Sequence, residues 1–414
     1  MKISVFPGRL CGTVQAVSSK SYAHRALISA SFLSDSPVKI YGKFNSSDVI
    51  ATVNCLKTLG ADIKITESYA YVVPVKRLPA EAVLDVKESA STYRFMLPIV
   101  SLLNVKTKFI LGKSLSNRPI APLLEALAPY ETKAEGGFIY GGKVAEKVVI
   151  DQSLSSQFVS GLMFALSVAC EKSEIVINGK RVSQSYVDMT ADVLNAFGVC
   201  VTKTENGYII EKRIASISEY FVEGDWSGAT FFLCAGAIGG KISVGGLNAK
   251  TLQGDCKILD ALKDFGAKIE VKGDTITVEK GERLPFSFDA ENCPDAVPAL
   301  AVLGAYAEGT TIIKNVSRLR IKESDRIRSI EKLLSSAKIK TQRKNDDLYV
   351  YGGKVYGVNF TSDDHRMIMA SAILSAYAEG TSIIEDVKAV DKSYPQFFED
   401  FKNVGGSFSV DMEG

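Results

Sequence analysis

Hydrophobic residues along the chain follow a spacing that changes in the same way six times. Apolar positions first recur every three or four residues, a glycine usually follows, and apolar and polar residues then alternate. This order of spacings is typical of a helix that ends at a glycine and continues into a β-hairpin. The six copies begin at Leu56, Leu123, Val193, Ile258, Leu333 and Phe397. Because their starts lie roughly 65–75 residues apart, each copy predicts a small α+β subdomain rather than a solenoid repeat.

Two helices ahead of these hairpins are predicted to be buried. Residues 157–170 and 365–380 are apolar around most of the helix surface rather than along one stripe, which is typical of a core helix. Hairpin turns are predicted at 205–207 (Glu-Asn-Gly) and 272–274 (Lys-Gly-Asp).

Six subdomains in 414 residues predict two domains of three, since a single core rarely serves a chain of this length. We expect an α/β fold (α+β repeats) with helices inside and sheets outside. The first domain is predicted to cover residues 15–226. The second is predicted to cover residues 227–414 and to be completed by an N-terminal strand within residues 1–14.

Composition excludes several classes of protein. The net charge is +2, from 49 basic and 47 acidic residues, so no overall field favours nucleic acid or a membrane surface. The first residues lack the apolar core of a signal peptide, and no segment approaches the roughly 18 apolar residues of a membrane span. Seven scattered Cys without a CxxC pair, and two His, predict a cytoplasmic protein without a disulfide framework or a metal site.

Charge is concentrated locally instead. Six of the ten residues at 320–329 (Arg-Ile-Lys-Glu-Ser-Asp-Arg-Ile-Arg-Ser) are charged, directly after a strand-like segment at 310–316. On a solvated helix such residues would form pairs spaced three or four apart. Here they are adjacent, so we expect under three turns of helix where a highly charged ligand binds, with a plain soluble surface as the alternative.

Cations and hydroxyl groups also stand at the starts of other predicted helices. Lys20, Ser21 and Arg25 fall within about one turn of a helix start, where free backbone N–H groups favour an anion. Comparable groups are Ser89, Ser91, Thr92 and Arg94; Arg118; Ser155, Ser156 and Gln157; Asp363, Asp364, His365 and Arg366; and the isolated Asp295 and Lys392. Each also has a plainer interpretation, as a helix cap or a solvated surface, and Asp295 as an N-cap.

Together these segments resemble the 5-enolpyruvylshikimate-3-phosphate synthase family (3-phosphoshikimate 1-carboxyvinyltransferases), which belongs to the enolpyruvyl transferases. The matching pieces, in the family's order, are SKSYAHRA from Ser19, SSQ from Ser155, PDA from Pro294, RIKESDRI from Arg320, DHRM from Asp364 and DKSYP from Asp391. The resemblance implies a two-domain inside-out α/β barrel. Each domain would contain three βαβαββ units with buried helices and outer sheets, and the ligand site would lie in the cleft between the domains.

The resemblance also implies an activity. The family transfers the enolpyruvyl group of phosphoenolpyruvate to the 5-hydroxyl of shikimate 3-phosphate, by addition–elimination through a tetrahedral intermediate, and releases phosphate. This reaction belongs to the shikimate pathway of aromatic amino acid biosynthesis and needs no metal or organic cofactor. The implied partners are these two small molecules, with no nucleic acid or membrane, and the implied state is a monomer.

Site residues are carried over from the matching motifs. Asp295 is implied as the base for the attacking hydroxyl, Glu323 as the acid at the methylene carbon, and Lys20 as a further catalytic group. Shikimate 3-phosphate would contact Lys20, Ser21, Arg25, Ser155, Ser156, Gln157, Ser183, Tyr186, Asp295 and Lys322. Phosphoenolpyruvate would contact Lys20, Ala90, Arg94, Arg118, Gln157, Glu323, Arg326, His365, Arg366 and Lys392. Two multiply charged substrates side by side would explain this many cations.

Two positions depart from the family pattern, and two other functions stay open. The family commonly has Asn near Arg318 and Gly in place of Ala90, and Ala90 implies a site that excludes the inhibitor glyphosate. The sister transferase that acts on UDP-N-acetylglucosamine is one alternative, although it typically bears a Cys in the loop where residues 111–119 contain none. A nucleic-acid clamp is the other, and near-neutral charge disfavours it.

Overall fold

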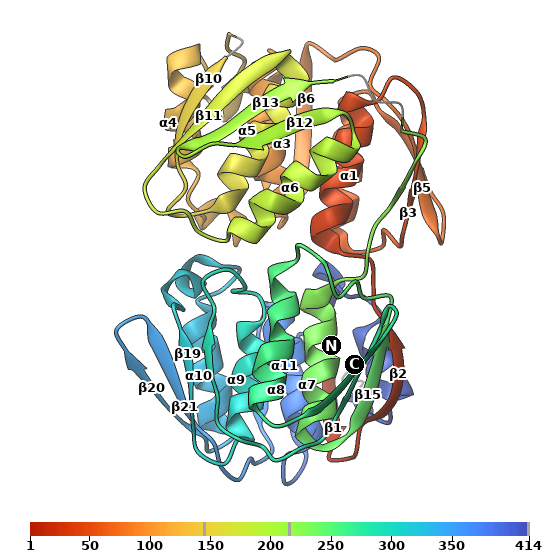
Figure 1. Cartoon of the computed structure of the whole chain (residues 1–414), viewed down its shortest axis with the longest axis vertical. Coiled ribbons are helices and arrows are strands. Elements are labelled where there is room, and N and C mark those ends of the chain that lie inside the picture. The colour runs from red at the N-terminus through yellow and green to blue at the C-terminus, as the bar shows by residue number, and fades with distance from the viewer. Residues whose placement is uncertain (144–145, 214–216, 412–414) are drawn as a thin grey trace. The chain divides into compact units, whose positions relative to one another are not determined.

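The computed structural model describes residues 1–143, 146–213 and 217–411 (Figure 1). The chain divides into unit 1, which consists of Met1–Val17 and Gly224–Gly414, and unit 2, which is Ser18–Glu223. Each unit has its own cluster of buried hydrophobic residues. The chain therefore begins in unit 1, forms all of unit 2, and then returns to complete unit 1.

Among its described residues, unit 2 contains three four-stranded sheets, in the orders β14-β3-β5-β4, β6-β7-β9-β8 and β10-β11-β13-β12. In each sheet the first two strands are parallel and the remaining pairs are antiparallel. The strands are β3 (Val38–Tyr41), β4 (Asp62–Ile65), β5 (Tyr69–Val73), β6 (Glu81–Lys87), β7 (Lys106–Leu111), β8 (Lys133–Glu135), β9 (Phe138–Tyr140), β10 (Lys147–Asp151), β11 (Lys172–Asn178), β12 (Val199–Lys203), β13 (Gly207–Lys212) and β14 (Glu219–Phe221).

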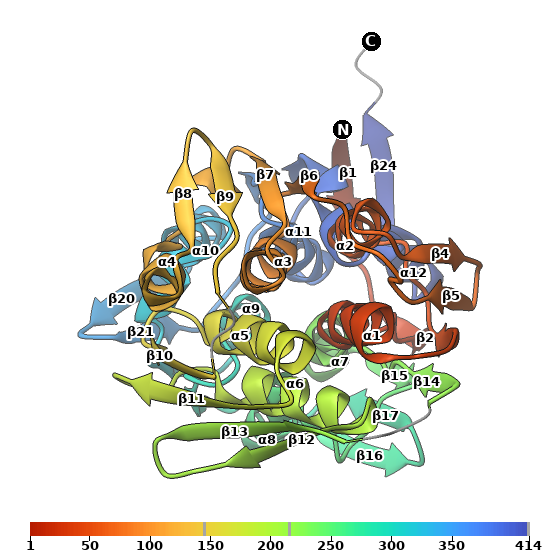
Figure 2. The same ribbon diagram turned by 90° about the horizontal axis from the view of Figure 1, so that it is seen from above.

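The helices of unit 2 lie inward of these sheets, as the end-on view in Figure 2 shows for α1, α3, α5 and α6. They are α1 (Lys20–Leu33), α2 (Ser47–Thr58), α3 (Ala90–Leu102), α4 (Ala121–Leu127), α5 (Ser156–Ala169) and α6 (Gln184–Ala196), with the short 3-10 helices η1 (Leu115–Asn117) and η2 (Ala128–Tyr130). The helix predicted at 157–170 is confirmed as α5, and eleven of its residues are buried.

Unit 1 repeats the same sheet pattern where the structure describes it, in the orders β22-β23-β1-β24, β16-β17-β15-β2 and β18-β19-β21-β20. Its strands are β1 (Lys2–Phe6), β2 (Cys11–Gln15), β15 (Lys241–Gly245), β16 (Lys268–Lys272), β17 (Thr275–Glu279), β18 (Ser287–Asp289), β19 (Thr310–Lys314), β20 (Lys340–Lys344), β21 (Asp347–Tyr351), β22 (Asn359–Thr361), β23 (Ser382–Glu385) and β24 (Ser407–Asp411). Its helices are α7 (Trp226–Gly239), α8 (Ile258–Asp264), α9 (Val297–Ala305), α10 (Arg326–Ser336), α11 (His365–Ala376) and α12 (Phe397–Asn403), with η3 (Gly254–Lys257), η4 (Ser317–Ile321) and η5 (Val387–Lys392).

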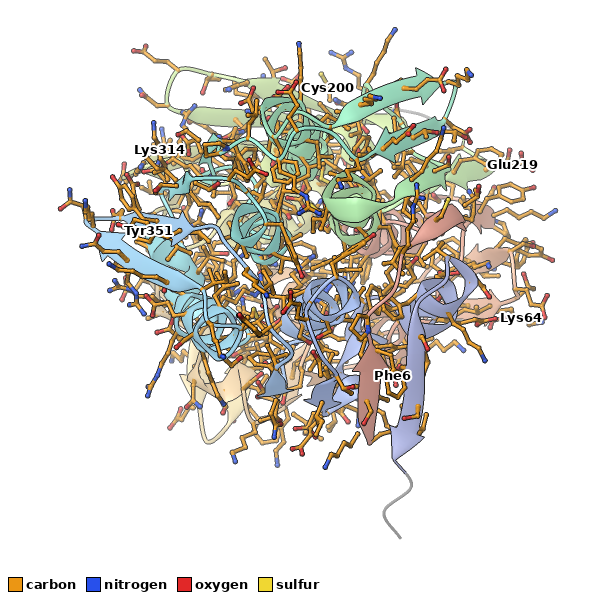
Figure 3. All side chains as sticks on the ribbon, turned by 90° about the horizontal axis from the view of Figure 1, so that it is seen from below. Phe6, Lys64, Cys200, Glu219, Lys314 and Tyr351 are labelled. Carbon is orange, nitrogen blue, oxygen red and sulfur yellow. The ribbon has the colours of Figure 1, made fainter. Side chains whose placement is uncertain are left out.

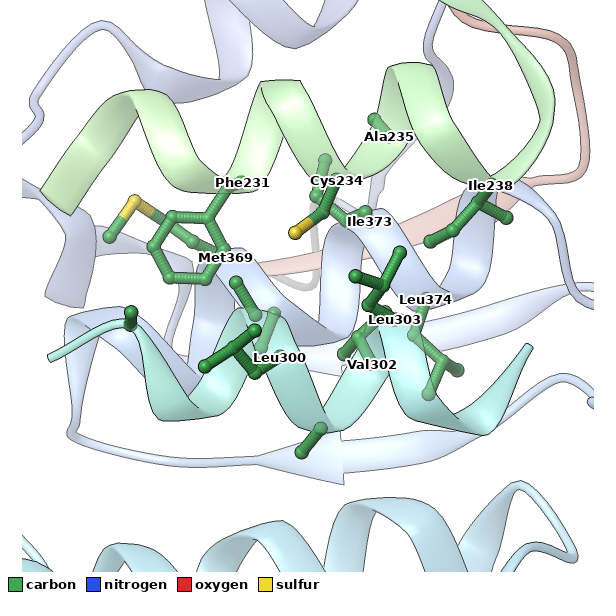
Figure 4. Packing of buried hydrophobic residues seen from close by; sticks show 14 of the residues in the cluster. Phe231, Cys234, Ala235, Ile238, Leu300, Val302, Leu303, Met369, Ile373 and Leu374 are labelled. Carbon is green, nitrogen blue, oxygen red and sulfur yellow. The ribbon is translucent and has the colours of Figure 1, made fainter. Parts of the chain in front are cut away.

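Three helices form the centre of the unit 1 core. Figure 4 shows Phe231 and Cys234 of α7 facing Leu300 of α9 and Met369 of α11, and all four residues are at most 1% exposed. These helices are apolar on nearly every side, so each must be covered on every side by protein. The prediction that residues 365–380 form a buried helix is confirmed for the part that is α11.

The predicted hairpins are confirmed for the first five copies of the repeat, including both turns, between β12 and β13 and between β16 and β17. In the part of the chain that the structure describes, the sixth copy lacks a second strand of its own, and the predicted N-terminal strand takes that place. Its strand β24 pairs with β1 from the start of the chain, from Lys2 opposite Asp411 to Phe6 opposite Ser407. A strand needs a neighbour to satisfy its backbone groups, and the N-terminus supplies it.

Polar and charged side chains lie on the outer faces of the sheets, together with exposed apolar ones such as Val83 and Phe221. Lys64, Glu219 and Lys314 project outward from β4, β14 and β19 in Figure 3. No helix in the described ranges is long and apolar enough to cross a membrane.

Candidate active site

The starts of several helices meet in unit 2. Lys20, the first residue of α1, contacts Asp48 near the start of α2, and the Thr92 hydroxyl of α3 lies 3.5 Å from the Asp48 carbonyl oxygen. Arg94 of α3 reaches the start of α5, and Arg25 of α1 reaches the start of α6. Helix starts carry free N–H groups and partial positive charge, so their meeting favours an anion.

Lys20 forms a largely buried ion pair. Its Nζ lies 2.8 Å from Asp48 Oδ2, and the two side chains are 14% and 7% exposed. The helix itself is capped by Ser19, whose Oγ accepts from the backbone N–H of Tyr22. Lys20 therefore stands at the start of α1 with its ammonium group paired to the Asp48 carboxylate.

Arg25 is embedded in the protein. It is 2% exposed and donates from Nε to Thr190 Oγ1, from Nη1 to the Ser21 carbonyl and from Nη2 to the Tyr186 carbonyl, each at 2.8 Å. Burial lowers its pKa to about 10, so it stays charged at neutral pH. Arg25 thus contacts two further residues of the implied shikimate 3-phosphate set, Ser21 and Tyr186, through their backbone carbonyls.

Arg94 connects α3 with α5. Its Nη1 donates to Gln157 Oε1 at 2.8 Å and Ser155 Oγ at 3.3 Å, and its Nη2 donates to the Pro119 carbonyl at 3.1 Å. Gln157 Nε2 donates in turn to Ser91 Oγ at 2.9 Å. This network groups the predicted ligands Arg94, Ser155 and Gln157 around two helix starts.

Close helix packing fixes the position of Arg94. An added Cβ at Gly161 of α5 would lie 2.2 Å from the Arg94 carbonyl oxygen. Pro98, four residues after Arg94, has no N–H to donate to that carbonyl. A glycine in α5 and a proline in α3 thus let the two helices approach closely at Arg94.

The other predicted residues of unit 2 lie at the same helix starts or next to them. Ala90 is the first residue of α3, Ser156 is the first of α5, and Ser183 precedes α6 with a left-handed backbone (φ 47°). Arg118 follows η1 and precedes Pro119, whose carbonyl accepts from Arg94.

Unit 1 contains a second cluster of charges, centred on Arg326. Among the described residues this side chain meets three carboxylates: Nη1 lies 2.7 Å from Asp295 Oδ1, Nη2 lies 2.5 Å from Glu323 Oε2, and Nε lies 2.7 Å from Asp364 Oδ2. Arg326 is 0% exposed. Such a site requires near-complete pairing, because a buried unpaired charge is costly.

Asp295 forms ion pairs with three cations. Besides Arg326, Arg366 Nη2 lies 3.0 Å from its Oδ2, and Lys322 Nζ lies 3.6 Å from its Oδ1. Burial alone would raise the Asp295 pKa, but Arg366, Lys322 and Arg326 hold this pKa well below its usual value. Burial lowers the Lys322 pKa to about 8, with Asp295 opposing the shift. Asp295 is therefore an ionised carboxylate at neutral pH, next to a lysine whose pKa lies much closer to neutrality than usual.

Two expectations for unit 1 are wrong. Residues 320–329 are not one helical stretch: η4 ends at Ile321, and α10 begins only at Arg326, with Asp325 as its N-cap. The connection between them carries Lys322 and Glu323, which pair with Asp295 and Arg326 respectively. Asp295 is also not an N-cap, since Ala296 takes that position before α9.

The remaining predicted residues of unit 1 differ in exposure. His365 is the first residue of α11 and is 0% exposed, with its Nδ1 3.7 Å from Asp364 Oδ1. Lys392 ends η5 and is partly exposed.

Two acids that organise the site were not among the predicted ligands. Asp48 pairs with Lys20, and Asp364 binds Arg326 while accepting from the Arg366 backbone N–H at 3.0 Å. Both are near helix starts, where an acid is usually a cap. The signal that could have identified them is the need of each cluster of cations for buried counter-charge.

The fold and these clusters define a class: a two-unit α/β protein whose helix starts and buried arginines suit small, multiply charged anions. Within the described ranges, no group of three or more His, Cys, Asp or Glu side chains could hold a metal ion.

Comparisons with known proteins agree with this class and narrow it. The family model for EPSP synthase (3-phosphoshikimate 1-carboxyvinyltransferase) matches residues 6–401, and the chain belongs to this family. The 3-phosphoshikimate 1-carboxyvinyltransferase of Pyrococcus abyssi is 37% identical over 95% of both chains, and that of Clostridium beijerinckii is 34% identical over 98% of both. The solved EPSP synthase of Acinetobacter baumannii superposes with a TM-score of 0.80 at 23% identity and covers 99% of each chain, which supports the fold.

Proposed function

We propose that the chain transfers the enolpyruvyl group of phosphoenolpyruvate to the 5-hydroxyl of shikimate 3-phosphate and releases phosphate. The observation that carries the proposal is the ion cluster in which Asp295 and Glu323 share Arg326. Family membership supports the same reaction. Two carboxylates on one buried arginine supply a base and an acid close to the same reacting atoms.

Both units are needed to supply the ligands of the two substrates. Shikimate 3-phosphate is assigned to Lys20, Ser21, Arg25, Ser155, Ser156, Gln157, Ser183, Tyr186, Asp295 and Lys322. Phosphoenolpyruvate is assigned to Lys20, Ala90, Arg94, Arg118, Gln157, Glu323, Arg326, His365, Arg366 and Lys392. Unit 2 contributes helix starts and hydroxyl groups, and unit 1 contributes the acids and most of the cations around them. Exclusion of water from these ligands would strengthen each of these contacts.

The reaction then proceeds in two balanced steps. In the addition, the 5-hydroxyl oxygen attacks C2 of phosphoenolpyruvate, its proton passes to Asp295, and protonated Glu323 gives a proton to C3. In the elimination, Glu323 takes a proton back from C3, the bond from C2 to the phosphate oxygen breaks, and phosphate leaves with the proton from Asp295. Both carboxyl groups return to their starting states, and Lys20 stabilises charge on the departing phosphate.

Substrate binding tunes the base. In the structure Asp295 is held ionised by Arg366, Lys322 and Arg326, which makes it a weak base. A substrate phosphate or carboxylate that attracts Arg326 and Arg366 weakens their interaction with the Asp295 carboxylate. The pKa of Asp295 then rises toward the range in which it accepts a proton from a hydroxyl group.

The finer features of the family are proposed along with the reaction. Each unit is proposed to be an inside-out α/β barrel, since its helices lie inward of its sheets. The protein is proposed to act in the cytoplasm as a monomer, on small molecules rather than nucleic acid.

The experiment that tests the proposal identifies the acceptor. Purified protein is incubated with phosphoenolpyruvate and either shikimate 3-phosphate or UDP-N-acetylglucosamine, and products are identified by mass spectrometry. An enolpyruvyl adduct of shikimate 3-phosphate alone is expected. An adduct of the UDP-sugar, or no adduct of either, would show the assignment to be wrong.

A further inference from the structure

A chain of buried hydroxyl groups runs between three helices of unit 2. His24 Nδ1 lies 2.7 Å from Thr52 Oγ1, Thr52 Oγ1 lies 2.6 Å from Thr92 Oγ1, and Thr92 Oγ1 lies 2.7 Å from Ser89 Oγ. All four side chains are 0% exposed. Bulk water does not compete for these hydrogen bonds. The donors and acceptors of these side chains must therefore be satisfied within the protein.

The direction of the bonds follows from one proton per hydroxyl group. Thr92 Oγ1 donates to Ser89 Oγ, which also accepts from the Thr92 backbone N–H as the N-cap of α3. Thr92 must then accept from Thr52, and Thr52 must accept from His24. His24 is therefore the tautomer with its proton on Nδ1. Burial, with Lys20 and Arg25 nearby, lowers its pKa well below the usual value, so the ring is neutral.

This chain lies one helical turn from the proposed ligands. Lys20 and His24 are four residues apart on α1, and Asp48 and Thr52 are four residues apart on α2, so each pair shares a helix face. Two pairs of side chains thus connect α1 with α2: Lys20 with Asp48, and His24 with Thr52. The hydrogen bonds of the second pair continue to Thr92 of α3 and to Ser89, which directly precedes Ala90.

We propose that His24 and Thr52 are positioning residues that hold the Lys20 ammonium group and the start of α3 at a fixed spacing, and so set the affinity for phosphoenolpyruvate. The proposal rests on the function proposed above. The start of α3 supplies Ala90 and Arg94, and only the phosphoenolpyruvate set includes both of these residues. Loss of these hydrogen bonds should therefore raise the KM for phosphoenolpyruvate more than the KM for shikimate 3-phosphate.

Thr52→Val breaks the chain at its middle while keeping the shape of the side chain, and Thr52→Ser keeps the hydroxyl group. For Thr52→Val we expect the KM for phosphoenolpyruvate to rise about tenfold, which is about 1.4 kcal/mol, with the KM for shikimate 3-phosphate within about twofold. Thr52→Ser should restore the KM for phosphoenolpyruvate. If Thr52→Val does not fold, Thr92→Val breaks the chain at the next link.

A matched control separates positioning from stability. Thr107 is also buried in unit 2, and its hydroxyl donates to the Val105 carbonyl at 3.0 Å. Thr107→Val should lower the melting temperature and leave both KM values unchanged. A Thr52→Val protein with a lower melting temperature but unchanged KM values, or with both KM values raised equally, overturns the positioning role. Absence of enolpyruvyl transfer by the unaltered protein instead contradicts the proposed function, and calorimetric titration with phosphoenolpyruvate then still compares Thr52→Val with the unaltered protein.

Discussion

Replacing Arg326 with Met should destabilise unit 1 strongly at neutral pH and much less at acid pH. The side chain is 0% exposed and pairs with Asp295, Glu323 and Asp364. Met fills a similar volume but leaves these carboxylates without their shared cation. Breaking a buried ion pair typically costs about 3–5 kcal/mol. For a unit of this size, that loss lowers the melting temperature by about 6–20 °C.

The pH dependence of this stability loss follows from the direction in which the Asp295 pKa is shifted. In the unaltered protein the Asp295 pKa is lowered, so its contribution to stability is present above its unfolded pKa and lost as pH falls through the folded pKa. Without Arg326, one of the three cations that lower the Asp295 pKa is lost, while burial and Glu323 still raise it. The stability lost in Arg326→Met should then be largest near pH 7–8 and shrink toward about pH 4–5, where Asp295 becomes protonated.

Scanning calorimetry of both proteins across this pH range measures the effect. Arg343→Met is the matched control, because Arg343 pairs with Glu331 in the same unit but with 34% and 27% of the two side chains exposed. Such a pair is worth about 0–1 kcal/mol. A loss in Arg326→Met no larger than in the control, or one that does not shrink on acidification, would refute the reasoning.

Three further outcomes are expected. Glu323→Gln should keep the fold and lower kcat about 10²–10⁴-fold, because it removes a proton donor; near-full activity at neutral pH would contradict its role as the acid. Ala90→Gly should lower the inhibition constant of glyphosate by roughly 5- to 150-fold, by removing a methyl group from a packed site; equal constants for the two proteins would contradict the steric argument. Gly161→Ala should cost about 1–3 kcal/mol in urea unfolding, since its Cβ would lie 2.2 Å from the Arg94 carbonyl oxygen. Gly353→Ala, whose nearest neighbour would lie at 4.0 Å, is its control and should be near neutral.

Local signals in the sequence predicted the repeating elements well. The change of spacing at a glycine places helix ends and hairpins because both are set by residues close together in the chain. The helix starts with Ser caps were predicted for the same reason, and Ser19, Ser89 and Ser155 are indeed N-caps.

Contacts between distant residues could not be predicted from such signals. An N-terminal strand was expected to complete the second domain, but its neighbours β23 and β24 could be identified only in the structure. Asp295 binds Arg326 and Arg366, which are 31 and 71 residues away. The isolation of Asp295 among apolar residues indicated either a helix cap or a functional site. Which of the two it is depends on the distant cations that the fold brings next to it. The same holds for Lys322 and Glu323, whose non-helical connection is shaped by the charges that they meet.

The central claim is that one chain, without a further component, transfers enolpyruvyl between two anionic substrates. Phosphate release measured with both substrates, and with each omitted in turn, tests it most directly. We expect one phosphate released for each shikimate 3-phosphate consumed, and release near background when either substrate is absent. Phosphate released from phosphoenolpyruvate alone at a similar rate would contradict it.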